Sequence, residues 1–495
     1  MQALKRVQRV GPKNFALKSL AEEQMQDPAL ASLRPRSFAR PVQLSLLLAG
    51  VVAGLSCTQD GPLTEEEMTQ LRTFMLLSGP PTDTSNAYSD DPGAAKLGKK
   101  LYFDGRYAGK LLAPYNVAAN VNGALGDPDV AGLVSCRACH APATGGADDR
   151  SQPNATSLGA GYTDRNATTV INSAYSPRWQ FWDGRVDSLW SQALSPPEGR
   201  LESNSNRLRV VHFLSKYYAG DFERVFGQGA LPPTIATLPS DGKPGDNGAF
   251  DQLAPTDQDS VNRAFANFGK AIAAYERRLV SSAFEPSPFD AFMAGNKDAM
   301  SPAAIRGARL FIGHAGCAEC HRGPTFTDFA FHNIGAPQTG EYTRRTDSGR
   351  YDGVGALTSA SNMFNRGNEL YSDDTTATGY LSELSGMTPD GLRGQFKTPT
   401  LRNVNKTAPY MHDGVYQTLW EVVNHYNFGG ATGPYEGTRD PAVAPLMLTD
   451  AELGDLVEFL RALDDGPPLP TTDFSEGLVA DPVLPPEPPT IVSTR

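Results

Sequence analysis

Two copies of one five-residue motif constrain this chain more than any other feature. Residues 136–140 read Cys-Arg-Ala-Cys-His, and residues 317–321 read Cys-Ala-Glu-Cys-His. Two thiols at this spacing lie about one helical turn apart. They can add to the two vinyl groups of a haem while the following histidine binds its iron. The chain is therefore predicted to carry two covalent haem c groups. The predicted attachment and iron-binding residues are Cys136, Cys139, His140, Cys317, Cys320 and His321.

A redox-active dithiol and a structural zinc site are the alternatives for such cysteine pairs. A zinc site usually brings two C-x-x-C units together as four ligands, and it does not require a histidine directly after each unit. The chain has five cysteines, and four of them belong to the two motifs. Haem attachment is therefore the favoured interpretation.

Length and charge narrow the possible functions. The chain has 495 residues, enough for two or three domains with a substantial core, and its formal net charge is −11. Such an acidic balance argues against nucleic acid as a partner, because phosphates are bound by an excess of Lys and Arg. It is compatible with a small basic electron donor, although bulk charge alone does not establish one.

The fifth cysteine, Cys57, follows a segment with the layout of an export signal. Three arginines within residues 34–40 precede an apolar run over residues 44–56. This order of a basic region, a short apolar core and a small residue is typical of secretory signals, and a cysteine at the cut suggests lipid attachment. A bare signal peptide and an uncleaved anchor remain alternatives. Because haem c is attached outside the cytoplasm, we expect a periplasmic protein in which residues 1–57 are an N-terminal extension plus signal.

Helical patterning recurs around both motifs. The expected helices cover residues 64–77, 94–104, 265–276 and 448–463, with another that begins at Ser301. Residues 337–394 are rich in Gly, Ser, Thr and Asp and are expected to form a long surface insertion. The Pro-rich residues 466–495 are expected to wrap the surface or to stay mobile.

Several longer stretches carry a resemblance to a known family. They are LGKKLYFDGR, SCRACHAPATGGAD, QFWDGR, GARLFIGHAGCAECHRGPTFTD and FKTPTLRNVNKTAPYMHDGVYQTLWEVVNHYNFGG. Together they resemble the bacterial di-haem cytochrome c peroxidase and MauG family, over roughly residues 90–465. The resemblance implies a mainly α fold of two cytochrome-c-like helical domains, each with one covalent haem, and long irregular loops. We expect the N-terminal haem domain at residues 58–295 and the C-terminal one at residues 296–465.

The resemblance implies that the iron of the first haem has an open coordination site. Many family members carry a distal histidine in a VGHGW-like stretch, and Ala160 of Ser-Leu-Gly-Ala-Gly-Tyr takes that position here. Alanine cannot bind iron, so the site is expected to admit peroxide. The alternatives are Tyr162, or a ligand from another loop.

The resemblance also assigns three residues around this haem. Glu202 would act as the acid–base group that moves a proton across bound peroxide, with Glu198 as the alternative. Pro196 would line the pocket. Trp182 would carry an electron between the haems, although plain core packing is the simpler explanation of a tryptophan.

At the second haem, the resemblance places the second iron ligand at Tyr426. Tyrosinate is a hard anionic ligand, whereas ordinary peroxidases of this family use a methionine. Met411, Met447 and His425 are the alternatives.

A calcium site between the domains is also implied. Asn166 would supply a side-chain oxygen, and Thr407 and Pro409 would supply backbone carbonyls, which are ligands that suit Ca²⁺. Family members are often dimers, so a homodimer is expected on the same basis.

Three functions are compatible with these residues. The first is a peroxidase that reduces hydrogen peroxide with electrons from a small cytochrome c or copper protein, relayed from the second haem to the first. The second is a MauG-like oxidase that forms a bis-ferryl state and oxidises a protein or organic substrate. The third is an electron carrier without enzymatic activity, which would require a second ligand on both irons.

Overall fold

The computed structural model describes most of the chain after the export-signal region. The described residues are 61–76, 79–113, 123–151, 155–245, 247–340, 342–343, 346–377, 381, 384 and 389–488. They belong to one compact unit, residues 58–495. The predicted export signal and Cys57 lie outside the described residues. Within the described part of the chain, no helix combines the length and the apolar character needed to cross a bilayer.

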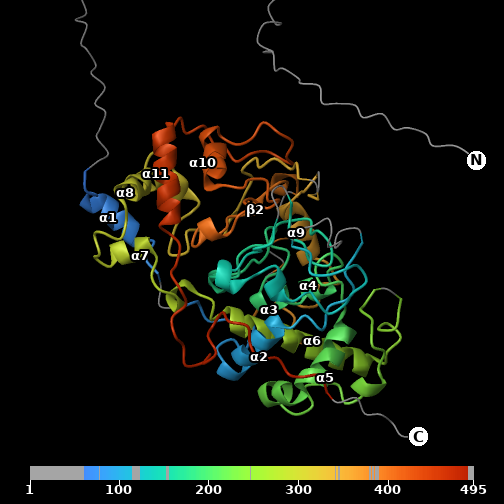
Figure 1. The fold of residues 1–495 in the computed structure, drawn as a ribbon. Coiled ribbons are helices and arrows are strands. Elements are labelled where there is room, and N and C mark those ends of the chain that lie inside the picture. Colours follow the sequence, from blue (N-terminus) through green and yellow to red (C-terminus); the bar gives the residue numbers. More distant parts are fainter. Residues whose placement is uncertain are drawn as a thin grey trace, which may run out of the picture. The chain divides into compact units, whose positions relative to one another are not determined.

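The described chain is mainly helical, as expected (Figure 1). Its only strands, β1 and β2, form a two-stranded antiparallel ladder in which His332 lies opposite Phe396. The helices are α1 (Glu65–Arg72), α2 (Pro92–Phe103), α3 (Leu189–Gln192), α4 (Ser195–Glu198), α5 (Arg207–Phe226), α6 (Pro255–Glu276), α7 (Pro288–Met293), α8 (Pro302–Ile312), α9 (Arg350–Leu357), α10 (Leu419–Asn427) and α11 (Asp450–Arg461), and the strands are β1 (Phe331–His332) and β2 (Phe396–Lys397).

Helix starts follow local capping chemistry. Thr64 and Thr449 each open a capping box at the start of α1 and α11, and Ser301 caps α8 with Pro302 in its first turn. Helix ends depend more on tertiary packing. The helix expected over residues 64–77 ends at Arg72, because the following turn buries Phe74 in an aromatic cluster.

The same helix crossing occurs twice. In the crossing of α2 with α6, a Cβ added to Gly98 would lie 1.8 Å from the carbonyl oxygen of Ala271. In the crossing of α8 with α11, a Cβ on Gly307 would lie 1.9 Å from the carbonyl oxygen of Asp455. Each crossing therefore requires glycine, because only a residue without a side chain lets the two backbones meet. Each pair of helices is the framework beside one C-x-x-C-H motif.

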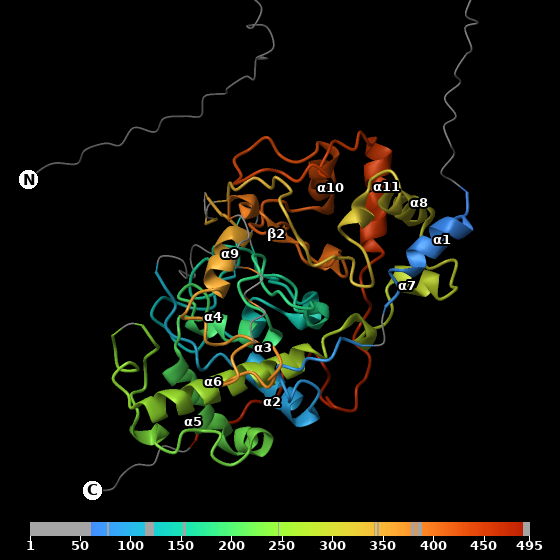
Figure 2. The same cartoon turned by 180° about the vertical axis from the view of Figure 1, so that it is seen from behind.

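Two hydrophobic cores surround these crossings. Figures 1 and 2 show α2, α5 and α6 gathered in one region and α1, α7, α8 and α11 in another. The first core is built mainly from α2, α5 and α6, and the second from α1, α7, α8, α10 and α11. The first helix of the described chain, α1, packs into the second core, whereas Phe474 and Leu478, near the end of the described chain, pack into the first.

The segment 337–394 is less of a surface insertion than expected. It contains α9, and the side chains of Asp347 and Arg350 are almost fully buried. Arg165 makes a bidentate ion pair with Asp347, at 2.7 Å for each contact, and Arg350 donates to the carbonyl oxygens of Asp183 and Gly184. Polar contacts of this kind leave no hydrophobic periodicity in the sequence, so the pattern could not reveal the burial.

Candidate haem sites

The first motif folds into a single tight turn that aims its histidine. Residues Cys136–Ala138 form a 3₁₀ turn, and the His140 N–H donates to the Cys136 carbonyl at 2.9 Å. The Nδ1 atom of His140 lies 2.8 Å from the carbonyl oxygen of Thr168, which can only accept, so Nδ1 carries the proton. Nε2 is left with its lone pair, as an iron ligand requires, and burial lowers the pKa of His140 and so favours the neutral ring.

A cavity of about 600 Å³ adjoins this turn, within the usual range of cofactor pockets. It is lined by Cys136, Cys139 and His140 together with Trp182, Pro196 and Glu202. Residues spread over 67 positions of the chain thus meet at one site. The two cysteines, the oriented histidine and the cavity fit a covalently bound haem c.

The wall of this cavity contains few groups that could bind iron opposite His140. Among the described residues that line it there is no second histidine and no methionine, and the hydroxyl of its one tyrosine, Tyr107, lies 3.7 Å from Cys136 Sγ. Ala160 is fully buried, and its N–H donates to the Glu202 carbonyl. The alternative ligand Tyr162 does not line the cavity; its ring stacks on Tyr342 with 3.8 Å between centroids.

The structure separates the two glutamates that compete for the acid–base role. Both carboxylate oxygens of Glu198 accept from Arg207 at 2.9 Å, and Glu198 is not among the cavity residues. Glu202 lines the cavity and is partly exposed. Gly199 makes room for it, because a Cβ there would lie 2.2 Å from Glu202 Oε2.

The surroundings of Glu202 suit a group that exchanges protons. Burial raises the pKa of its carboxyl group, the positive charge of Arg185 lowers it, and Asp164 raises it again; the net direction is upward. Because its pKa is raised, a larger fraction of this carboxyl group is protonated at a given pH than of an exposed one. This is the behaviour expected of an acid–base residue. Its role stays a prediction.

Trp182 connects the first cavity to loops of the second half of the chain. Its indole N–H donates to the Asn166 carbonyl at 2.9 Å, and its ring lies edge-on to His412 at 6.5 Å. The His412 ring in turn stacks on Phe396 of β2 at 3.7 Å. Trp182 therefore stands at a junction of packed rings, where its position suits electron transfer as well as packing.

The second motif repeats the geometry of the first. Residues Cys317–Glu319 form a 3₁₀ turn, and Nδ1 of His321 lies 2.9 Å from the carbonyl oxygen of Phe326. Its Nε2 is therefore also available to iron. Burial raises the pKa of Tyr426 on α10, and Cys317 and Cys320 of the second motif lie close enough to raise it further through their charge.

The competing ligands for the second haem are less well placed. Both ring nitrogens of His425 are engaged: Nε2 with the Ile334 carbonyl at 3.0 Å and Nδ1 with the Tyr416 hydroxyl at 3.0 Å. Met447 is 83% exposed, and Met411 is half-buried with a left-handed backbone, φ 69°. Ligation by Tyr426 stays a prediction, and this geometry favours it.

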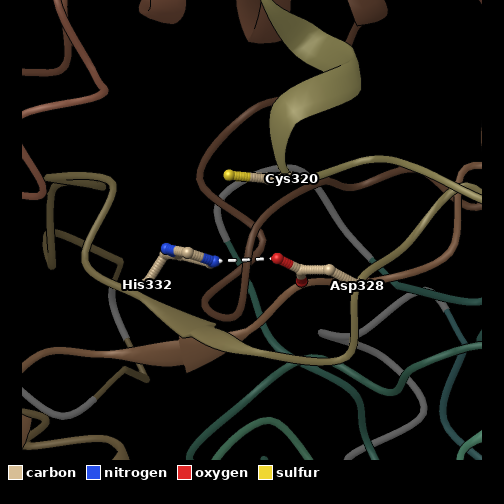
Figure 3. A group of neighbouring side chains, drawn as sticks. All are labelled: Cys320, Asp328 and His332. Carbon is tan, nitrogen blue, oxygen red and sulfur yellow. Dashed lines mark hydrogen bonds and ion pairs between the residues drawn. The ribbon is translucent and has the colours of Figure 1, made fainter.

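One cluster near the second motif resembles a metal site but has another explanation. Cys320, Asp328 and His332 present donor atoms within 4.8 Å of one another (Figure 3). Once Cys320 is bonded to haem as a thioether, it has no thiolate to offer a metal ion. His332 lies 3.2 Å from Asp328 and 2.8 Å from Asp440, and its hydrogen bonds to these two carboxylates raise its pKa. The cluster is therefore a charged imidazolium between two carboxylates beside the second haem.

Two of the three predicted calcium ligands lie together. The Asn166 side-chain amide donates to the Pro409 carbonyl at 2.7 Å, while no contact places the Thr407 carbonyl. The nearby Asp413 is 1% exposed, and neither carboxylate oxygen has a well-formed hydrogen bond to a described residue. Burial raises its pKa to about 7. An amide, a carbonyl and a buried carboxylate are compatible with Ca²⁺, so calcium also stays a prediction.

Sequence reasoning missed several residues of the first cavity. Gln192, Arg185 and Glu276 line it, as do Asp352 and Ala356 of α9. Asp352 of α9 lies 150 positions after Glu202 in the sequence, and no local sequence pattern predicts that two such distant segments line one cavity. Glu276 did leave a signal, since it is an acid that ends the apolar run Ala-Ile-Ala-Ala-Tyr.

Comparison with known proteins agrees with this geometry. A family model of di-haem cytochrome c peroxidases matches residues 92–298. The chain is 34% identical over 398 residues to cytochrome-c peroxidase IdrP1 of Denitromonas iodatirespirans, covering 79% of this chain and 85% of that protein. It is 29% identical over 378 residues to the methylamine utilization protein MauG of Methylorubrum extorquens, covering 76% and 79%.

A solved structure shares the fold. The diheme peroxidase BthA from Burkholderia thailandensis superposes with a TM-score of 0.54 at 21% identity, covering 82% of this chain and 93% of that chain. Two C-x-x-C-H turns, two helix crossings and these relatives lead to one assignment. The chain belongs to the di-haem cytochrome c peroxidase and MauG family.

Proposed function

We propose that this protein is a periplasmic peroxidase that reduces hydrogen peroxide with electrons from a small cytochrome c or copper protein. One observation carries the proposal: a single cavity is lined by the first C-x-x-C-H motif and by Glu202. A haem held there has a carboxyl group beside it and no second histidine or methionine among the described lining residues. Such a site favours catalysis over simple electron carriage, which needs a ligand on both sides of the iron.

Haem c, when bound, supplies the iron that takes up and releases electrons. The chain's own residues do the rest. The hydrogen bond from His140 Nδ1 to the Thr168 carbonyl fixes this ring, and its Nε2 would hold the haem iron. The Glu202 carboxylate would accept a proton from one oxygen of hydrogen peroxide and donate it to the other, which could then leave as water. Overall, hydrogen peroxide takes two electrons and two protons and yields two water molecules.

The two electrons would enter through the second haem. Trp182 lines the first cavity and touches His412, a residue of the loop that leads to α10 and Tyr426. The packed rings of Trp182, His412 and Phe396 support a route for electrons between the two halves of the chain. Pro196 would narrow the cavity and help to exclude water.

Steady-state turnover is the direct test. Reduced cytochrome c should be oxidised on addition of peroxide, and electron paramagnetic resonance of the ferric protein should show one high-spin and one low-spin haem. If no donor protein is oxidised in a peroxide-dependent way, the peroxidase is rejected. If both haems are low-spin, the protein is an electron carrier.

A MauG-like oxidase is the second candidate, and a specific observation favours it. Tyr426 lies within electrostatic range of the attachment cysteines of the second haem, and a tyrosinate ligand there would stabilise oxidised iron better than a methionine. A tyrosine-ligated second haem would then serve to store oxidising equivalents for a protein or organic substrate. Persistence of the oxidised state for minutes after peroxide addition would support the oxidase, whereas rapid return with a cytochrome donor would support the peroxidase.

A further inference from the structure

Glu276 is a second carboxyl group in the wall of the first haem cavity, and the reaction described above does not use it. It is the last residue of α6 and is 4% exposed. It lines the cavity on the side of the motif, where its charge acts on Cys136 and on Tyr102 of α2. A carboxyl group so deeply buried is rare unless it is paired or functional.

Among the described residues, no cation forms an ion pair with the Glu276 carboxylate. Its Oε2 atom has no hydrogen-bond partner among the described residues. The adjacent cations are used elsewhere: Arg277 pairs with Asp90 at 2.9 Å, and Arg278 lies 3.6 Å from Asp473. Glu276 also sits at the C-terminal end of a long helix, where the helix dipole disfavours a negative charge. The neutral form is therefore favoured, and burial raises the pKa of Glu276 to about 8.

The titratable groups near Glu276 do not exchange protons near neutral pH, so Glu276 is the group there that can. Burial raises the pKa of Tyr102 and of Tyr275 far from the neutral range, so both phenols stay protonated. Cys136 would be a thioether in the protein with haem attached. Glu202 and Arg185 also line this cavity.

We propose that Glu276 binds one proton when the first haem gains an electron and releases that proton when the electron leaves. The step balances: a ferric haem, one electron from the donor protein, one proton from water and the Glu276 carboxylate become a ferrous haem and a carboxylic acid. The physical cause is charge. In a buried cavity a carboxylate is tolerated beside the more positive ferric haem and is costly beside the ferrous haem. This role rests on haem c at the first motif and not on the identity of the oxidant.

The test is the reduction potential of the first haem as a function of pH, measured on the intact di-haem protein. Rising pH favours the carboxylate, which stabilises ferric iron, so the potential should fall as pH rises through the pKa of Glu276. One proton per electron corresponds to a tenfold change in the equilibrium constant per pH unit, or 59 mV. In Glu276→Gln the potential should be flat over the same pH range, because the amide cannot titrate.

Two matched variants make the result specific. Glu369→Gln removes an exposed carboxyl group outside the cavity and should keep the wild-type slope. Glu202→Gln removes the other carboxyl group that lines the cavity; if the slope is lost in this variant and kept in Glu276→Gln, the proton is bound at Glu202 and the proposal is wrong. If Glu276→Gln retains the wild-type slope, or if the wild type has none, the proposal is wrong.

A spectroscopic measurement covers the case in which Glu276→Gln attaches haem poorly. The infrared difference spectrum of reduced minus oxidised wild-type protein should gain the carbonyl band of a protonated carboxylic acid, and the band should shift in heavy water. Absence of this band overturns the proposal. Neither measurement uses peroxide, so the proton site and the peroxidase can fail independently.

Discussion

Two carboxyl groups line the first haem cavity, and the charges around them differ. Glu202 faces the cation Arg185, which favours its ionised form and suits it to accept a proton from peroxide. Glu276 has no such partner among the described residues and favours its neutral form. The pKa values of both carboxyl groups are raised, but only Glu202 is subject to a cation that favours its ionised form.

Removing the Glu202 carboxyl group should abolish proton transfer without disturbing haem attachment. We expect Glu202→Gln to lower kcat/KM for peroxide by about 10²- to 10⁴-fold, the usual contribution of an acid–base residue. In the wild type, kcat/KM should rise with pH as Glu202 ionises, with a midpoint above the ordinary value of 4.5 because burial raises its pKa. The variant should lack this rise. A variant that keeps both the rate and the pH profile would remove Glu202 from the mechanism.

The second iron ligand can be identified by spectroscopy of two variants. Tyr426→Phe removes the phenol oxygen, so the low-spin signal of the second haem should be lost or altered in electron paramagnetic resonance. Met447→Leu should leave that signal unchanged, because Met447 is 83% exposed. The reverse outcome, with Met447→Leu altering the signal and Tyr426→Phe not, would assign the ligand to the methionine.

The residues of the site were predictable only where a motif names them. The two C-x-x-C-H motifs fix the cysteines and histidines by their own chemistry, and the family resemblance brought Trp182, Pro196 and Glu202 to one place. Glu276 and Asp352 line the same cavity but belong to no motif. Their positions follow from how α6 and α9 pack, and packing between distant segments is not encoded in a local pattern.

At the scale of elements, the fold depends on one helix crossing used twice. Gly98 and Gly307 occupy matching positions in Gly-x-x-Leu-aromatic segments of α2 and α8. A Cβ atom added to either glycine would lie less than 2 Å from a backbone carbonyl oxygen of the crossing helix. The helix starts were predictable from Ser, Thr and Pro, whereas α9 was not, because hydrogen bonds from Arg350 to the Asp183 and Gly184 carbonyls, rather than a broad apolar face, hold it.

A methyl group at one of these crossings should destabilise the second core. Gly307→Ala forces α8 away from the Asp455 carbonyl, and we expect the free energy of unfolding to fall by about 1–3 kcal/mol or more, as for other overpacked sites. Gly454→Ala on the facing helix α11 is the matched control, since a Cβ there meets nothing within 4 Å. It should stabilise by about 0.5–1 kcal/mol, because alanine favours a helix over glycine.

Denaturant unfolding followed by circular dichroism measures both variants. Equal effects of the two substitutions would show that helix propensity, and not the close approach of the backbones, governs this crossing.

At the scale of the whole molecule, each end of the described chain packs into the core that is formed mainly by the other half of the sequence. Helix α1 is anchored in the second core by Phe74 and by the ion pair of Glu67 with Arg309 at 2.7 Å. The C-terminal tail returns to the first core, where the Tyr275 hydroxyl donates to the Leu478 carbonyl at 2.9 Å and Lys99 donates to the Gly477 carbonyl at 2.5 Å. Each core is thus completed by a segment from the far end of the sequence, so damage to an end should weaken the opposite core.

Phe474 tests this arrangement, because it is the buried aromatic anchor of the tail. It is 2% exposed and packs edge-on against Tyr275 of α6 at 5.9 Å. We expect Phe474→Ala to lower the free energy of unfolding by about 3–5 kcal/mol, the usual cost of removing a buried phenylalanine. Val483→Ala, at an 88% exposed position of the same tail, should change it by less than about 0.5 kcal/mol. Tyr275 directly precedes Glu276 in the wall of the first haem cavity. The absorption signal of the first haem should therefore be lost at a lower denaturant concentration than in the wild type, while that of the second haem is unchanged. If both variants unfold like the wild type, the tail only covers the surface, and the first core is complete without it.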